Sequence, residues 1–180
     1  MMKIGLFYGS STNNTEYIAF DIRDMVDAQL GAESVELHNV GRAELGEMLA
    51  YDHLILGIPT WDIGELQADW DIVWSDLGTL NLSGKKIAIF GLGDQYGYPD
   101  TFLDAAGILA ETVLELGGEL VGYTAIEGYE FEASLFLDGD RFMGLALDED
   151  RQSDQTRDRL ETWVQQILSE FALTPEAVAA

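Results

Sequence analysis

The chain has no cysteine among its 180 residues, and this absence excludes several kinds of chemistry. Without cysteine there is no disulfide, no thiol nucleophile, no cysteine-held iron–sulfur cluster and no thioether-linked haem. Histidine is almost missing as well. His38 and His53 have no second histidine at metal-ligand spacing, so we expect structural histidines and no metal site. A redox function would therefore depend on a bound organic cofactor.

Basic residues are scarce: nine lysines and arginines stand against 33 acidic residues, which gives 9 − 33 = −24. Such a surface repels phosphate backbones and anionic headgroups, so we expect no nucleic acid or membrane partner. The acidity can be a coat that favours solubility, or it can steer the protein onto a basic partner in a way that salt weakens. Charge alone does not decide between these two interpretations.

Long apolar runs are missing too. No stretch of about 18 apolar residues is present, so no membrane span is expected. The opening "MMKIGLFYG" is interrupted at Gly9 and is typical of a first strand rather than of a signal peptide. We therefore expect a cytoplasmic protein. The length suits one domain, predicted at residues 1–172, followed by a C-terminal tail at 173–180.

What is present is a regular alternation of apolar patterns. Strands are predicted at 4–8, 35–38, 53–58, 87–90 and 120–126, and helices at 15–30, 45–49, 66–77, 102–116 and 160–171. This alternation predicts a doubly wound α/β fold, a five-stranded parallel sheet with helices on both faces. Pro59 is expected to end the third strand. The acidic and aromatic segment 127–141 is predicted to be an insertion that splits the fifth strand, which resumes at 142–147.

Ligands of open α/β sheets bind beyond the carboxyl ends of the strands. Six small polar residues follow the first strand: Ser10, Ser11, Thr12, Asn13, Asn14 and Thr15. Backbone N–H groups at a helix start, together with hydroxyls, can hold a phosphate without a cation. Neither a Walker loop nor a dinucleotide glycine pattern is present. Taken alone, the stretch favours a simpler interpretation, a capped helix start with Asn14 or Thr15 as N-cap.

Aromatic residues follow the third and fourth strands, in "PTWDIGE" and "GLGDQYGYP". Trp61, Tyr96 and Tyr98 lie among turn residues, where a ring can serve as a stacking plate for a ligand. Trp61 can equally pack beneath its own loop. Combined with the polar stretch after the first strand, these loops predict a site for a flat aromatic ring with a single phosphate.

The same segments resemble the flavodoxins. "GLFYGSSTNNTE", "LILGIPTWDIGELQADW", "GKKIAIFGLGDQYGYPD", "GYEFEAS" and "FMGLALDEDRQSD" are similar to successive signatures of that family, over residues 3–171. The split fifth strand is typical of its long-chain subgroup. "HLILGIPTWDIGE" and "QADWDIVW" suggest the second-flavodoxin branch of proteobacteria. The resemblance implies the strand order 2-1-3-4-5.

It also implies a function, a low-potential one-electron carrier that holds FMN non-covalently and alternates between semiquinone and hydroquinone. Residues 10–15 would bind the phosphate, Trp61 and Tyr98 would stack on the two flavin faces, and Asp150 would lie near the ribityl chain. Leu92, Gly93 and Asp94 would meet the pyrimidine edge. The remaining implied contacts are Pro59, Thr60, Asp62, Ile63, Gly64 and Thr101.

The chain departs from the family pattern at Asn13 and Asp62, where glycine, or at the second position glycine or asparagine, is frequent. Asparagine is the non-glycine residue best able to adopt positive φ, so we expect the first loop to be kept. The 62–63 peptide is expected to turn and accept a hydrogen bond from flavin N5. The β-branched Ile63 should make that turn harder than glycine would.

The resemblance implies partners as well: an NADPH-dependent flavodoxin or ferredoxin reductase as donor, and basic-faced redox enzymes as acceptors. We expect a monomer and no catalytic activity of its own. Two alternatives share the topology. A flavodoxin-like NAD(P)H:quinone reductase is disfavoured by the missing nicotinamide pattern and the acidic surface. A phosphoacceptor signalling domain needs an aspartate ending the third strand, where this chain has Pro59.

Overall fold

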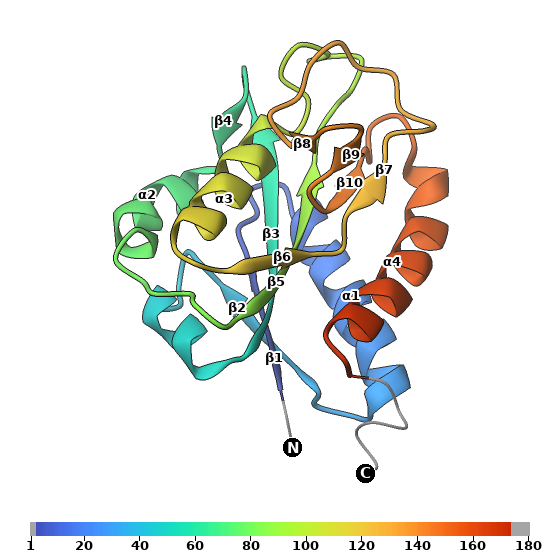
Figure 1. Ribbon diagram of the computed structural model, residues 1–180. Coiled ribbons are helices and arrows are strands. Elements are labelled where there is room, and N and C mark those ends of the chain that lie inside the picture. Colours follow the sequence, from blue (N-terminus) through green and yellow to red (C-terminus); the bar gives the residue numbers. More distant parts are fainter. Residues whose placement is uncertain (1–2, 174–180) are drawn as a thin grey trace.

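The computed structural model describes residues 3–173, which form three layers with a sheet in the middle (Figure 1). Of the tail predicted at 173–180, Leu173 is described and is buried, with its N–H donating to the Leu168 carbonyl; residues 174–180 lie outside the described residues. The main strands are β1 (Ile4–Tyr8), β2 (Val35–Asn39), β3 (His53–Trp61), β5 (Lys86–Leu92), β6 (Glu119–Val121) and β10 (Leu145–Leu147). The helices are α1 (Asn14–Leu30), α2 (Ala68–Leu77), α3 (Asp104–Glu115) and α4 (Thr156–Glu170), with short 3-10 turns η1 (Leu45–Ala50) and η2 (Ser153–Gln155).

The sheet has the order β10-β5-β3-β1-β2, with parallel pairing between each of these neighbours. This confirms the doubly wound fold and the order 2-1-3-4-5. The fifth position is shared by two short strands on the same side of β5. β6 pairs with its first half, from Lys86 to Ala88, and β10 with its second half, from Phe90 to Leu92.

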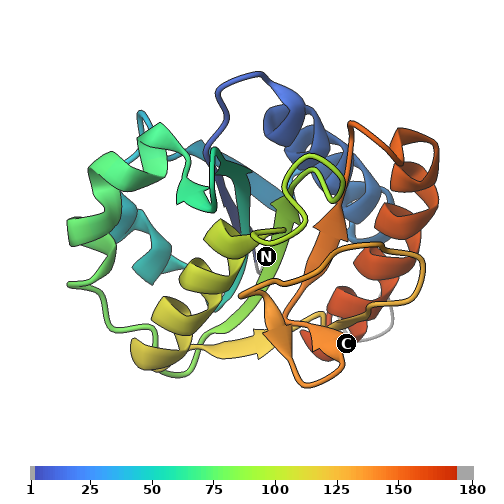
Figure 2. The same cartoon turned by 90° about the horizontal axis from the view of Figure 1, so that it is seen from above.

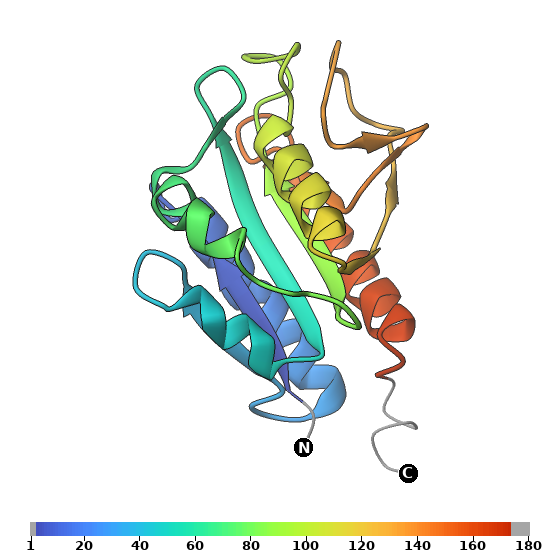
Figure 3. The same ribbon diagram turned by 60° about the vertical axis from the view of Figure 1, so that its left-hand side comes forward.

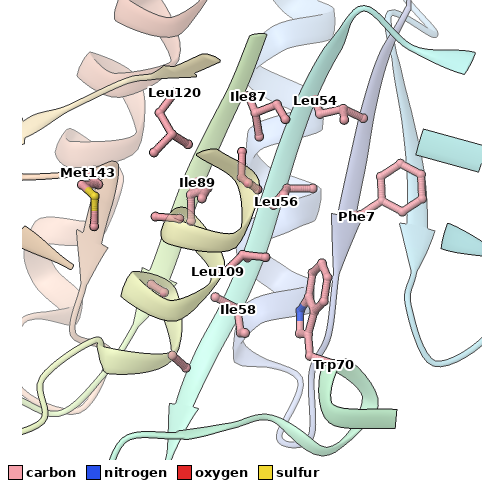
Figure 4. Close-up of a cluster of buried hydrophobic side chains, with 14 of the residues drawn as sticks. Phe7, Leu54, Leu56, Ile58, Trp70, Ile87, Ile89, Leu109, Leu120 and Met143 are labelled. Carbon is pink, nitrogen blue, oxygen red and sulfur yellow. The ribbon is translucent and has the colours of Figure 1, made fainter. Parts of the chain in front are cut away.

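Each face of the sheet has its own apolar cluster. Seen from above, α2 and α3 cover one face, and α1 and α4 cover the other (Figure 2). Successive β3 side chains alternate between them: Leu54, Leu56 and Ile58 belong to the α2/α3 cluster (Figure 4), whereas Ile55 belongs to the α1/α4 cluster. Burying one such side chain contributes about 1.5–3 kcal/mol, so β3 stabilises the packing on both faces of the sheet.

Pro59 does not end the third strand, and that prediction was wrong. β3 continues to Trp61, with Pro59 in register opposite Leu92 of β5. The pairing of β1 with β3 stops earlier, at Tyr8 opposite Gly57. Ile58 and Pro59 therefore lie in a gap between the pairing with β1 and the pairing with β4, which begins at Thr60, and the missing N–H of proline breaks no ladder there. The extra length carries Trp61 past the sheet.

The segment between β6 and β10 forms a small antiparallel sheet of β7 (Thr124–Ala125), β9 (Arg141–Phe142) and β8 (Leu137–Asp138). It lies beside α3 (Figure 3) and buries Phe136 and Phe142 in the α2/α3 cluster. The contact with α3 is close: a Cβ on Gly107 would lie 2.3 Å from the Leu135 carbonyl carbon. The predicted insertion thus covers the sheet edge with its aromatic side chains.

Candidate cofactor site at the strand ends

A cavity of about 320 Å³ opens at the carboxyl ends of β1, β3, β5 and β10. Its lining residues are Ser11, Thr12, Asn14, Thr15, Pro59, Thr60, Trp61, Asp62, Leu92, Gly93, Asp94, Tyr98, Glu149 and Asp150. All but Glu149 were predicted from the sequence. A cavity of similar volume between β7 and α4 contains none of them.

Five predicted residues do not line this cavity: Ser10, Asn13, Ile63, Gly64 and Thr101. Thr101 lines a small adjoining hollow together with Thr60 and Tyr98. Glu149 was not predicted, although it lies in the acidic run "DEDR" next to Asp150, which was predicted. Burial raises the pKa of the Glu149 carboxyl, and the neighbouring Asp148 and Asp150 raise it further.

The polar loop after β1 turns sharply into α1. Asn13 takes the left-handed conformation at φ 68° and is the N-cap, with its carbonyl accepting from the Tyr17 N–H at 2.9 Å. The expectation of Asn14 or Thr15 as N-cap was wrong, because both are already helical. The Asn13 side chain makes no capping hydrogen bond, which leaves the N–H groups of the first turn directed toward the cavity end of the helix.

Three predicted residues carry buried polar atoms that, within residues 3–173, have no hydrogen-bond partner. These atoms are Ser10 Oγ, Trp61 Nε1 and Thr101 Oγ1. An unsatisfied buried polar group costs about 1–3 kcal/mol, so three from the predicted ligand-binding loops are costly unless a ligand or water bonds to them. Their donors fit a ligand that is rich in acceptors, such as a phosphate and an oxidised heterocycle.

The end of the cavity where the sequence predicts the flat ring, called here the ring end, includes the hairpin between β3 and β4 (Glu65–Leu66). Its three-residue turn has positive φ at Asp62 (44°) and at Gly64 (81°), while the Ile63 side chain is 77% exposed. The strained backbone position in this turn is therefore Asp62, one of the two residues at which the sequence departs from the family pattern. A Cβ at Gly64 would lie 3.0 Å from Asp104 Oδ2, so the turn rests directly on α3.

The loop after β5 is held from several sides. Asp94 accepts from the N–H groups of Gly97 at 2.8 Å and Tyr96 at 3.1 Å, and its ion pair with Arg151 is 3.2 Å long. Burial alone would raise the pKa of Asp94, but these N–H groups and the guanidinium outweigh it and lower that pKa. Tyr96 in turn donates to Glu130 of the insertion at 3.0 Å.

Beneath that loop lies a buried pair that sequence reasoning missed. The Gln95 amide and backbone N–H both donate to Asp148 Oδ2, at 2.9 and 3.0 Å, and Gln95 Oε1 accepts from the Glu130 N–H. The loop after β5, the end of β10 and the insertion are thereby joined. Nothing in the sequence marked Gln95, because a glutamine in a turn is normally exposed.

The electrostatics of the cavity are one-sided. Asp62, Asp94, Glu149 and Asp150 line it, and its lining contains no lysine or arginine. Within residues 3–173, Arg151 is the one cation that hydrogen-bonds to a lining residue: it donates to Asp94, and its guanidinium carbon lies 5.7 Å from the Tyr96 ring centroid. An anion held here depends on N–H groups and hydroxyls alone.

The chain is similar to known proteins over nearly its whole length. Residues 6–163 match the family model for flavodoxin. The chain is 49% identical over 174 residues to a flavodoxin of Synechococcus elongatus, covering 96% of this chain and 100% of that one. It is 50% identical over 173 residues to Flavodoxin 2 of Escherichia coli, covering 95% and 98%. These near-equal identities do not single out the proteobacterial branch, which stays a prediction.

The fold comparison agrees. The structure of a Fusobacterium nucleatum flavodoxin bound to flavin mononucleotide superimposes with a TM-score of 0.86 at 31% identity, over 94% of this chain and 99% of that one. In the part of the chain that the structure describes, no helix is both long and apolar enough to cross a membrane. Matching in sequence over nearly its whole length and in the order of its strands, this chain belongs to the flavodoxin family.

Proposed function

We propose that the cavity at the strand ends binds FMN non-covalently and that the protein carries single electrons at low potential. The observation that carries this proposal is the composition of one cavity: a hydroxyl-rich helix start, two aromatic side chains and several carboxylates, without a cation. The flavodoxin of Fusobacterium nucleatum, whose structure is similar over nearly the whole chain, was solved with flavin mononucleotide.

The proposed binding roles follow the two ends of the cavity. The backbone N–H groups and hydroxyls of residues 10–15 bind the phosphate. Trp61 and Tyr98 stack on the ring, Leu92, Gly93 and Asp94 contact its pyrimidine edge, and Asp150 lies beside the ribityl chain. Pro59, Thr60, Asp62, Ile63, Gly64 and Thr101 complete the proposed contacts, with Ile63, Gly64 and Thr101 as part of the surrounding turns.

FMN when bound supplies the one-electron chemistry, and the protein supplies position and electric field. The carboxylates of Asp62, Asp94, Glu149 and Asp150 oppose the accumulation of negative charge at the cavity. The phosphate, held without lysine or arginine, adds to the same field. Reduction is thereby made more difficult, which makes the reduced protein a stronger reductant.

Flavodoxins are electron-transfer proteins that interact with redox partners. For this chain we propose an NADPH-dependent flavodoxin or ferredoxin reductase as donor and basic-faced redox enzymes as acceptors, because the net charge is −24. Its reduction by such a reductase should slow or change markedly as salt is added, and indifference to ionic strength would count against electrostatic docking. A monomeric, cytoplasmic protein stays a prediction of the sequence.

Stepwise reduction with dithionite tests the proposal. We expect the purified yellow protein to develop a long-wavelength absorption band and lose it again on full reduction. Direct bleaching without that band would contradict a one-electron carrier. NADPH added to the same protein without a reductase should leave the spectrum unchanged, whereas bleaching would favour the quinone-reductase alternative.

A further inference from the structure

Gln67 is the N-cap of α2 and is nevertheless almost completely buried, with 1% of its surface exposed. Its amide makes three hydrogen bonds. Oε1 accepts from the Trp70 N–H at 3.3 Å, and Nε2 donates to Asp69 Oδ2 at 3.0 Å and to Ser11 Oγ at 3.2 Å. The last bond joins α2 to the polar loop after β1, across 56 residues of sequence.

The two outer partners fix the orientation of the amide. The Trp70 N–H can only donate, and the Asp69 carboxylate, when ionised, can only accept. A flipped amide would place its NH₂ group against an N–H and its oxygen against a carboxylate, losing both bonds. The NH₂ group must therefore face Ser11, and Ser11 Oγ must be the acceptor in that contact.

A serine hydroxyl that accepts from a fixed amide keeps its own hydrogen for another partner. Ser11 lines the cavity and its side chain is exposed there. Orientation matters more in this site than in one with a lysine, because neutral donors are directional and the cavity lining contains no cation. A hydroxyl turned the other way would present lone pairs to the anion.

The packing around Gln67 shows that the contact is built into the fold. A Cβ on Gly9 would lie 2.1 Å from Gln67 Oε1 and 2.7 Å from Trp70 Cδ1, so only glycine at the end of β1 lets the amide come this close. Trp70 is held in turn by Gly57, whose carbonyl accepts from Trp70 Nε1 at 3.0 Å. Gln67 cannot withdraw without disturbing β1, β3 and α2.

We infer that Gln67 is a positioning residue for the phosphate end of the site, which presets the Ser11 hydroxyl as a donor to the FMN phosphate. This inference rests on the proposed FMN function. Riboflavin has the same ring as FMN and lacks the phosphate. A residue that acts only through Ser11 on the phosphate should change the affinity for FMN and leave that for riboflavin almost unaltered.

The experiment titrates the apoprotein with FMN and with riboflavin. The dissociation constant for riboflavin divided by that for FMN is the FMN preference, the ratio that the variants are compared by. Gln67→Met keeps the side-chain volume and loses the amide, so the affinity for FMN should fall roughly 3- to 10-fold, and that for riboflavin less than about twofold. Gln67→Glu should reduce the FMN preference by about tenfold or more, because the hydroxyl hydrogen then turns to the new carboxylate.

Ser11→Ala should reduce the FMN preference by a similar factor, and adding Gln67→Met to it should cause little further loss of that preference. Gln166→Met is the matched control. Gln166 is half-buried on α4, where its amide donates to the Tyr123 carbonyl and to Glu170, and it lies outside the cavity lining. It should alter the melting temperature of the apoprotein and leave the ratio unchanged.

Equal losses of FMN and riboflavin affinity in a folded Gln67→Met protein would overturn the inference. So would full additivity of the two substitutions. If the Gln67 variants fail to fold, Ser11→Ala still decides: an unchanged ratio would mean that the hydroxyl makes no preferential contact with the phosphate. A wild-type protein that binds neither ligand would instead contradict the proposed function itself.

Discussion

The two ends of the cavity are built differently. At the phosphate end the donors come from a regular helix start, backed by buried Thr15 and Gln67. At the ring end the walls are turns with exposed Tyr98 and Ile63, a strained Asp62 and a partly exposed ion pair between Asp94 and Arg151. For the proposed FMN site, the difference predicts that recognition of the phosphate is preset, whereas the surroundings of the ring can adjust when its charge changes.

Trp61→Ala should have the largest effect, and it tests whether Trp61 at the ring end contributes to ring binding alone. We expect the affinities for FMN and riboflavin to fall by the same factor, roughly 10- to 100-fold, because stacking on a flat heterocycle contributes about 1–3 kcal/mol. Fluorescence titration of the apoprotein measures both constants. Trp74→Ala, a half-buried tryptophan of α2 outside the cavity lining, is the control, and an unequal loss would mean that Trp61 also serves the phosphate.

Arg151→Gln tests the charge at the ring end. It removes the partner of Asp94, and one uncompensated charge at about 10 Å and an effective dielectric near 20 corresponds to roughly 1.7 kcal/mol, or about 70 mV. Because the pair is partly exposed, we expect the reduction potential to fall by about 20–70 mV, and less at high salt. Arg23→Gln breaks a comparable pair with Asp24 on α1, and an equal shift there would make net charge the cause.

Ile63→Gly tests whether the turn at the ring end limits the chemistry. Glycine frees the 62–63 peptide to rotate, so we expect stronger long-wavelength absorbance at half reduction, by about a factor of two. The Ile63 side chain is 77% exposed, so melting of the apoprotein should change by a few degrees at most. Unchanged absorbance would show that the turn rotates freely with isoleucine in place.

Asn13→Gly is the matching substitution at the phosphate end and should do least. Asn13 already has φ 68°, does not line the cavity, and its side chain makes no capping hydrogen bond, so glycine can replace it without altering the loop. We expect the affinity for FMN to stay within about twofold. A loss of tenfold or more would mean that the asparagine side chain contacts the cofactor.

The fold was largely predictable because burial imposes strong periodicity. The unbroken apolar runs of β1 and of the first part of β3 left little choice but buried central strands. The continuation through Pro59 was not predictable, because it depends on where the neighbouring β1 stops pairing. The N-cap was also predicted wrongly. Sequence patterns identify N-caps by side chains that can accept a hydrogen bond from the first turn, whereas Asn13 is the N-cap through its left-handed backbone.

Most of the cavity lining was predicted from loops at the strand ends. What sequence could not supply was the supporting polar groups, Gln67, Gln95 and Asp148, which are all buried. Glutamine and aspartate normally indicate surface, and only the assembled fold shows that their partners are fixed. The residues that line the cavity were easier to predict than the buried polar residues behind them.

The divided edge position of the sheet has a consequence for engineering. β6 and β10 each pair with their own segment of β5, so neither half relies on the chain that joins them for its sheet pairing. The β8–β9 hairpin of that connection has an exposed tip at Gly139 and Asp140. A reporter or a recruiting domain spliced into this tip would be attached to a covered edge, with the sheet pairing intact and the cofactor end free for electron exchange.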